Sequence, residues 1–150
     1  MTANGMVSGA EDLAGALVRI LGPDRVLGRE QDRLLYEYDG SVSRRMPDVV
    51  VLPDNAAEIA EIVKTARAFD VPVVARGSGT GLSGAAIPLE GGIVLSTTRM
   101  NRILEVDFRN RRAVVEPGVV NLSCRKRRWR ADSITRPIRR AKRRVRSAGT

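Results

Sequence analysis

The sequence predicts an α+β fold, and three observations support this. Two short apolar runs, 49–52 and 71–74, flank a stretch with helical periodicity, which is the pattern of a βαβ unit. Two further runs, 103–108 and 113–116, flank a polar turn and indicate a β-hairpin. A glycine-rich loop follows the second apolar run. We therefore expect a βαβ-containing lobe and then the start of a strand-rich lobe.

The first 46 residues form a helical and irregular lead-in. Asp12–Leu21 is predicted to be a short helix that ends at Gly22-Pro23, because its apolar residues recur at helical spacing. Residues 24–46 have a mixed pattern. We expect their buried points to be Leu34, Leu35, Tyr36 and Tyr38.

The run Val49–Leu52 contains three β-branched residues, which predicts a strand buried on both faces, as in a parallel sheet. Asp54 or Asn55 can cap the helix that follows, and Glu58 lies in its first turn, where the helix dipole favours an acid. That helix should end near Asp70. Its predicted apolar face is Ile59, Ile62, Val63, Ala66 and Phe69.

The second strand, 71–74, completes a βαβ unit over 49–75 that we expect to be right-handed. A third strand, 93–96, follows Gly91-Gly92. In the hairpin, Pro117-Gly118 closes the second strand. Its apolar contacts are expected from Val106, Phe108, Val114 and Val115.

The positive charge of the chain is confined to its end. The 150 residues carry a net charge of +9, but residues 125–150 account for +11 and residues 1–124 for −2. The absence of histidine excludes histidine-based acid–base catalysis and histidine metal ligands. The single cysteine, the lack of a signal peptide and the lack of a transmembrane run lead us to expect a cytoplasmic protein.

The glycine-rich loop is the strongest candidate site. It offers backbone N–H groups almost free of side-chain bulk, which suits a phosphate or pyrophosphate. Its glycine spacing matches neither the dinucleotide pattern nor a Walker loop, so a flexible surface turn remains an alternative. Its position after a parallel strand favours ligand binding. Arg76 could help to neutralise a phosphate, and the hydroxyl groups of Ser78, Thr80 and Ser83 could bind phosphate oxygens.

Residues 47–121 resemble the FAD-binding domain of the p-cresol methylhydroxylase and vanillyl-alcohol oxidase (PCMH) type. The segments PDVVVLP, VPVVARGSGTGLSG and VVEPGVV occur in the order of that family. The resemblance is greatest to its D-2-hydroxyacid branch, which includes the FAD-binding subunit of glycolate oxidase and D-lactate dehydrogenases. It implies that the loop binds the FAD pyrophosphate and that Pro117 and Gly118 lie near the cofactor. The implied loop contacts are Arg76, Gly77, Ser78, Gly79, Thr80, Gly81 and Leu82, with Ser83 and Gly84 continuing the loop.

The resemblance also implies an activity. Members of the D-2-hydroxyacid branch oxidise a 2-hydroxy acid by transferring a hydride to FAD, and some act with other oxidase subunits. Their substrate-binding and base residues lie in regions beyond those that this chain matches, so we expect the chain alone to be inactive. Ala85 replaces a glycine that is common in the family, which is a mild departure.

The basic segment 123–150 has two interpretations. One is a nucleic-acid-binding tail, in which Trp129 lies among arginines and could stack on bases. The other, which we favour, is a frameshift near Leu122–Ser123, because residues 131–150 read in another frame can give GLDYAPDPSSQAACTIGGN, a segment of the kind found in the family. We then expect a disordered tail without a specific nucleic-acid partner.

The predicted organisation is a lead-in over 1–46, a partial FAD-binding domain over 47–122 and the tail over 123–150. Two alternative functions stay open at this point. The loop could serve a phosphate-binding module without catalysis, or the tail could bind nucleic acid.

Overall fold

The computed structural model describes residues 4–107 and 109–120, with the backbone alone for residues 4–11. Its centre is a four-stranded sheet with the order β1-β2-β4-β3. β2 and β3 both run parallel to β4, and β1 runs antiparallel to β2. The strands are β1 (Val26–Leu27), β2 (Val49–Val51), β3 (Val73–Arg76) and β4 (Ile93–Ser96).

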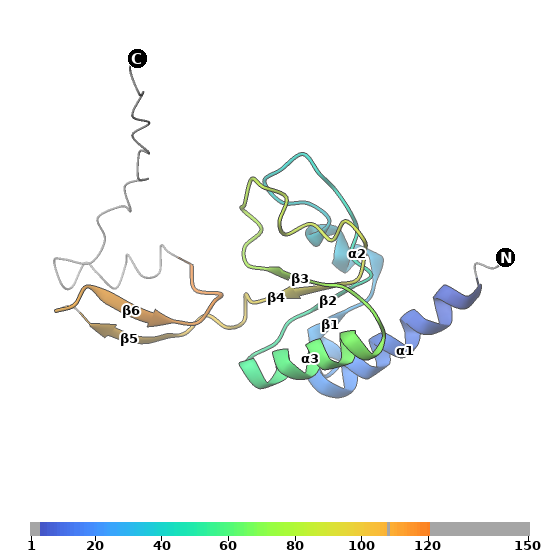
Figure 1. Ribbon diagram of the computed structural model, residues 1–150, viewed down its shortest axis with the longest axis horizontal. Helices are drawn as coiled ribbons and strands as arrows, with labels where there is room; N and C mark the ends of the chain where they lie inside the picture. Colours follow the sequence, from blue (N-terminus) through green and yellow to red (C-terminus); the bar gives the residue numbers. More distant parts are fainter. Residues whose placement is uncertain (1–3, 108, 121–150) are drawn as a thin grey trace, which may run out of the picture.

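Two helices, α1 (Asn4–Leu21) and α3 (Ala56–Ala68), cover one face of this sheet (Figure 1). The hydrophobic core lies between these helices and the strands. Burial of its apolar side chains is the main favourable contribution to folding. Its buried members are Leu13, Leu17, Leu21, Val49, Val51, Ile62, Ala66, Ile93 and Leu95.

The opposite face of the sheet is covered by the long connection 77–92 between β3 and β4 (Figure 1). Val50 and Val94 are fully buried, although they alternate with the residues that face the helices. Ile87 and Pro88, in the connection, are buried as well. The prediction that the Val49 strand is buried on both faces is therefore confirmed.

The two strands of the predicted βαβ unit are not neighbours. β4 lies between β2 and β3, and pairs Val94 with both Val50 and Val74. Every residue of β4 is buried, whereas β3 is only partly buried. A strand whose residues are all buried is most stable at the centre of a sheet, where both backbone edges are paired and both faces are covered.

Helix α3 begins where the sequence predicts, and of the two proposed cap residues, Asp54 and Asn55, it is Asn55 that forms the N-cap. The Glu58 N–H donates a 3.0 Å hydrogen bond to Asn55 Oδ1. Ile62 and Ala66 face the core, as predicted, but Val63 and Phe69 are 48% and 39% exposed. The predicted apolar face was too wide, because α3 lies at the surface and only a narrow stripe reaches the sheet. The helix ends at Ala68, close to the predicted end.

The lead-in differs more from expectation. The first helix starts at Asn4 and is longer than the predicted Asp12–Leu21. Residues 23–36 form η1 (Pro23–Arg25), β1, α2 (Glu30–Arg33) and η2 (Leu34–Tyr36). Leu34, Leu35 and Tyr38 are exposed, so the expectation that they are buried was wrong. The carbonyl oxygens of Leu35 and Tyr38 accept hydrogen bonds from the Arg76 side chain, whereas the side chains of these two residues are exposed.

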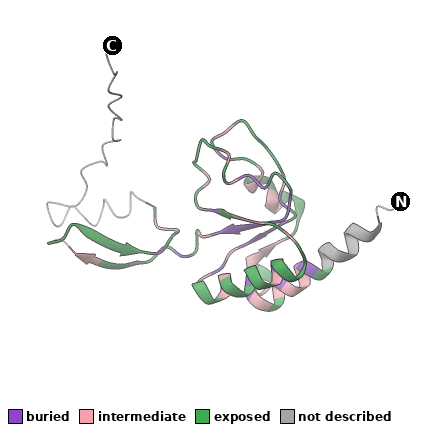
Figure 2. Cartoon of the chain, viewed as in Figure 1, coloured by how far each residue is buried: buried purple, intermediate pink, exposed green. Residues whose placement is uncertain are grey.

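The predicted hairpin is confirmed as β5 (Ile103–Asp107) and β6 (Arg112–Val115), paired antiparallel. It projects from the sheet and is largely exposed (Figure 2). Val114 and Val115 are 45% and 38% exposed, so they bury less surface than expected, and Phe108 lies outside the described residues. Asp107 closes the turn by accepting a 2.9 Å hydrogen bond from the Asn110 N–H.

The predictions for the tail, including that for Trp129, lie outside the described residues. Among the helices that the structure does describe, none is long and apolar enough to cross a membrane.

Candidate functional site

The glycine loop, defined here as residues 77–84, starts at the carboxyl end of β3. Arg76 pairs with Ser96 of β4, and the Thr97 N–H donates a 2.9 Å hydrogen bond to Arg76 O. The loop therefore leaves the sheet at the edge where its parallel strands end. This is the edge at which α/β sheets bind ligands.

The backbone N–H groups of the glycine loop have no partner within residues 4–107 and 109–120. Across the described part of the chain, none of the eight N–H groups of residues 77–84 donates a hydrogen bond to protein. Gly79 and Gly84 have left-handed φ values of 67° and 73°, which change the direction of the chain within the loop. A run of free donors in such a loop suits an anion with several oxygens, so the geometry fits a pyrophosphate.

The loop is also accessible. Ser78, Thr80, Ser83 and the Leu82 side chain are exposed, so the three hydroxyl groups predicted to bind phosphate are open to solvent. A Cβ built on Gly77 or Gly81 would meet nothing within 4 Å among the described residues. That part of the chain thus gives no steric reason for glycine at these two positions. Close approach of a ligand to the backbone would supply one.

The Arg76 side chain has a different place from the one that sequence reasoning gave it. It is only 7% exposed, and its Nη1 donates a 2.7 Å hydrogen bond to Tyr38 O. Its Nη2 donates to Leu35 O at 3.3 Å, and its guanidinium carbon lies 5.4 Å from the centre of the Tyr36 ring. The guanidinium therefore faces the lead-in, while the backbone of Arg76 leads into the glycine loop.

A second segment, 38–41, packs against the glycine loop and was missed by sequence reasoning. The Gly40 N–H donates a 2.9 Å hydrogen bond to Gly81 O, and a Cβ on Gly40 would lie 2.7 Å from the same oxygen. Asp39 is buried and accepts a 2.7 Å hydrogen bond from the Ser41 N–H. Hydrogen bonding from Ser41 is the largest cause that lowers the pKa of Asp39. The turn-forming sequence Asp39-Gly40-Ser41 was the available signal.

Pro117 and Gly118 lie at the same edge of the sheet as the glycine loop. A Cβ on Gly118 would overlap the backbone of Thr97, which follows β4 directly. Since Thr97 is hydrogen-bonded to Arg76, the structure brings together the two parts of the predicted site. Glu116 fixes this return of the chain by accepting hydrogen bonds from the Arg102 N–H and side chain at 2.6–2.8 Å.

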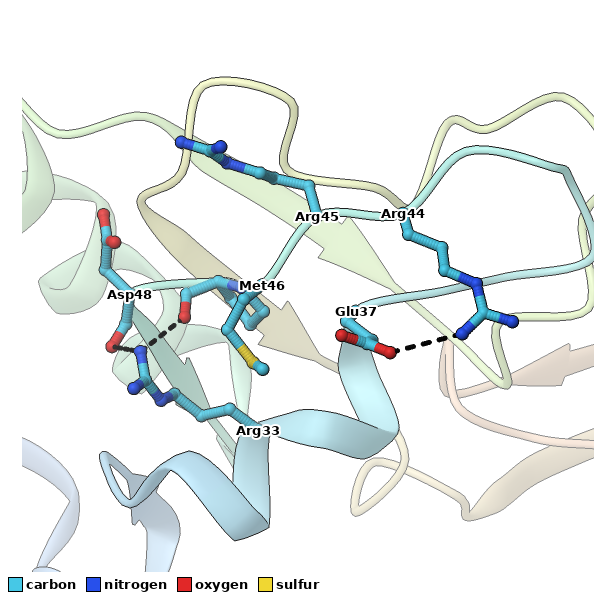
Figure 3. Close-up of a pocket in the computed structure, with 7 residues that line it drawn as sticks. Arg33, Glu37, Arg44, Arg45, Met46 and Asp48 are labelled. Carbon is cyan, nitrogen blue, oxygen red and sulfur yellow. Dashed lines mark hydrogen bonds and ion pairs between the residues drawn. The ribbon is translucent and has the colours of Figure 1, made fainter.

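A separate recess of about 400 Å³ lies among residues 33–48 (Figure 3). Arg33 donates to Pro47 O at 2.7 Å and to Asp48 O at 2.9 Å, and Arg44 pairs with Glu37 at 3.4 Å. Asp48 immediately precedes β2, so the recess borders the amino end of that strand. The glycine loop begins at the carboxyl end of a strand parallel to it. The recess is therefore not part of the glycine-loop site.

Comparison with known proteins gives one family for most of this region. A family model described as "FAD binding domain" matches residues 47–128. The chain is 42% identical to the glycolate oxidase subunit GlcD of Bacillus subtilis (strain 168) over 113 residues, which are 75% of this chain and 24% of that protein. It is 54% identical to a D-lactate dehydrogenase of Archaeoglobus fulgidus over 71 residues, 47% of this chain and 16% of that protein.

Solved structures share the fold. The structure of p-cresol methylhydroxylase with substrate bound matches 82% of this chain and 25% of its own, with a TM-score of 0.75 and 21% identity. The 4-ethylphenol oxidase of Gulosibacter chungangensis, an isoeugenol complex, matches with the same TM-score and coverage and 25% identity. The predicted α+β fold of the PCMH type is thereby confirmed. The chain spans 16–25% of the length of the relatives and solved structures named here.

Proposed function

Because the chain belongs to the FAD binding domain family, we propose that the glycine loop binds the pyrophosphate of FAD through its backbone N–H groups. The domain is that of flavin oxidoreductases related to glycolate oxidase and D-lactate dehydrogenase, and its cofactor is FAD. Two points remain proposals: the residues that bind FAD, and the substrate of the whole protein.

The eight N–H groups over 77–84, which donate to none of the described residues, carry the proposal for the place of binding. Hydrogen bonds from N–H groups to charged oxygens are roughly twice as strong as those between neutral groups. The loop lies at the carboxyl edge of the sheet, where Pro117 and Gly118 also return to β4. We therefore assign the FAD contacts to the backbone of residues 76–84, with Pro117 and Gly118 bordering the site.

The substrate proposed for the whole protein is a 2-hydroxy acid such as glycolate or D-lactate. Support comes from the names of the relatives, which specify these two acids. FAD, when bound, supplies the acceptor for the hydride that leaves the hydroxyl-bearing carbon. The domain described here contributes cofactor binding and orientation. The word "subunit" in the name of one relative makes further subunits part of the same proposal.

The binding proposal is tested by titrating the purified 150-residue chain with FAD and following flavin fluorescence. ADP and inorganic pyrophosphate should compete with FAD, whereas riboflavin, which has no phosphate, should bind at least ten-fold more weakly. A folded chain that binds riboflavin as tightly as FAD would overturn the assignment to the glycine loop. Pyrophosphate binding as tight as that of FAD would favour a general phosphate-binding module.

The substrate proposal needs a separate measurement. Anaerobic addition of glycolate or D-lactate to the longest available protein that carries this domain should bleach the flavin absorbance. L-lactate, with the opposite configuration, is the matched control and should bleach it far more slowly. Bleaching by none of the three acids, in protein that retains FAD, would contradict the proposed substrate class.

A further inference from the structure

We propose that Arg76 is a positioning residue, which holds segment 35–41 against the glycine loop and does not bind the cofactor phosphates through its side chain. This inference rests on the proposed function, because it concerns how the same loop is shaped for FAD. It also assigns a role to the lead-in, which sequence reasoning left without one.

The first support is the set of partners of the Arg76 guanidinium. Two of its nitrogens donate to backbone oxygens of the lead-in, Nη1 to Tyr38 O at 2.7 Å and Nη2 to Leu35 O at 3.3 Å. The Tyr36 ring lies within cation–π distance, at 5.4 Å. Only a planar group with several donors can make these three contacts together, so lysine could not replace arginine here.

The second support comes from Gly79, inside the glycine loop. A Cβ at this position would overlap the Arg76 guanidinium, and Gly79 has a φ of 67°. The guanidinium thus packs directly against the loop backbone as well as against the lead-in. Gly79 is required for this packing and for its backbone conformation.

The third support is the charge around Arg76. Asp39 is buried, and its Oδ2 has no hydrogen-bond partner among the described residues. The charge of Arg76 is the smallest of the causes that lower the Asp39 pKa, behind the hydrogen bonds that Asp39 accepts. A carboxylate of the lead-in is therefore near enough to Arg76 to interact with its charge.

The consequence is a loop whose shape is set before the ligand arrives. Arg76 holds the carbonyl groups on either side of Tyr36, and the Gly40 N–H then reaches Gly81 O at 2.9 Å. Fixing the loop in advance reduces the conformational entropy that binding would otherwise cost. The loop is held through the Arg76 side chain and through the carbonyl oxygen of Gly81. These contacts do not use the N–H groups of the loop, which therefore stay available to the ligand.

The first experiment uses the ligand-free chain and follows amide hydrogen exchange by NMR. In R76Q and R76K, exchange at the Gly40 amide should rise at least ten-fold, while the amides of β2 and β4 keep their protection. R67Q, on the exposed side of α3, is the matched control and should change neither. Unaltered exchange at Gly40 in folded R76Q would overturn the proposal.

If R76Q fails to fold, Y36L decides the question, since it removes only the ring beside the guanidinium. Faster exchange at Gly40 than in the wild-type chain, with a protected sheet, supports the positioning role. Exchange at Gly40 equal to that of the wild-type chain contradicts it.

The second experiment distinguishes positioning from phosphate binding by titrating the variants with FAD. A positioning role predicts that R76K loses as much affinity as R76Q, because neither keeps the paired contacts, and that the salt dependence of Kd is unchanged. A phosphate contact predicts that R76K retains most of the affinity and that R76Q reduces the salt dependence. Failure of the wild-type chain to bind FAD would contradict the proposed function, whereas the exchange experiment would still test Arg76.

Discussion

The Gly118 N–H donates a 2.8 Å hydrogen bond to the carbonyl oxygen of Met100. This contact joins the end of the hairpin to the turn that follows β4. A Cβ at position 118 would overlap the carbonyl group of Thr97, so only glycine allows the two backbones to come this close. The position of the whole hairpin relative to the sheet therefore depends on this crossing.

We expect G118A to destabilise the packing of the hairpin on the sheet. The added methyl group must displace backbone, and overpacking of this kind costs about 1–3 kcal/mol. Urea unfolding should show a lower midpoint for G118A. G28A is the matched control, because a Cβ there meets nothing within 4 Å. Equal midpoints for the two variants would mean that the crossing is not needed for stability.

The sequence predicted the elements whose signals are local. The run Val49–Leu52 was identified as a strand, and Asn55 was one of the two residues proposed as the helix cap, since β-branched runs and N-cap residues act over a few positions. The insertion of β4 between β2 and β3 was not predicted, because strand order depends on contacts between distant segments.

The candidate site shows the same division. The glycine loop was found from its composition and from its place after a strand. The contact between Gly40 and Gly81 was not found, because it joins residues about forty positions apart. The hydrogen-bond partners of the Arg76 side chain were not predicted either, because Leu35 and Tyr38 are also distant from Arg76 in the sequence.

Ile62 and Val63 of α3 were both predicted to face the core, but only Ile62 is buried. Substituting each in turn tests how α3 packs on the sheet. Ile62 is fully buried, and I62A should destabilise the fold by about 2–5 kcal/mol through lost burial and a cavity. Val63 is 48% exposed, so V63A should cost less than about 1 kcal/mol, helped by the higher helix propensity of alanine. Chemical denaturation followed by circular dichroism measures both. Equal losses would place Val63 in the core, as the sequence alone suggested.

Stability should fall in acid partly because of Glu116. Hydrogen bonds from the Arg102 side chain, followed by that from the Arg102 N–H, lower the pKa of this buried carboxyl below its ordinary value of 4.5. The carboxylate therefore stabilises the fold fully above that value. Its contribution is lost as the pH falls through the lower pKa of the folded state.

E116Q should reduce the loss of stability at low pH, because glutamine does not titrate. The variant should be less stable than the wild-type chain at pH 7, and the difference should shrink as the pH falls below about 4.5. Thermal unfolding midpoints measured from pH 7 to pH 3 test this. E105Q, whose parent glutamate is exposed and lies 3.6 Å from Arg112, is the control and should follow the wild-type curve more closely. A constant difference between E116Q and wild type at every pH would contradict the ionic role.

The glycines of the loop allow ligand binding to be separated from folding. A Cβ on Gly81 meets no protein atom within 4 Å, and the residue does not have a left-handed φ. G81A should therefore fold at least as well as the wild-type chain, since replacing glycine at a compatible position stabilises by about 0.4–1 kcal/mol. If the pyrophosphate lies against this backbone, the methyl group instead occupies the space that the phosphate needs.

We accordingly expect G81A to weaken FAD binding by about ten-fold or more, since one hydrogen bond to a charged group contributes about 1.5–3 kcal/mol. G77A should behave in the same way, because its Cβ also points into open space. G28A is equally open but lies outside the site, so it should leave FAD affinity unchanged. Fluorescence titration gives the affinities, and thermal unfolding confirms that each variant is folded. Wild-type affinity in both G77A and G81A would show that the pyrophosphate does not lie against this loop, whatever else the domain binds.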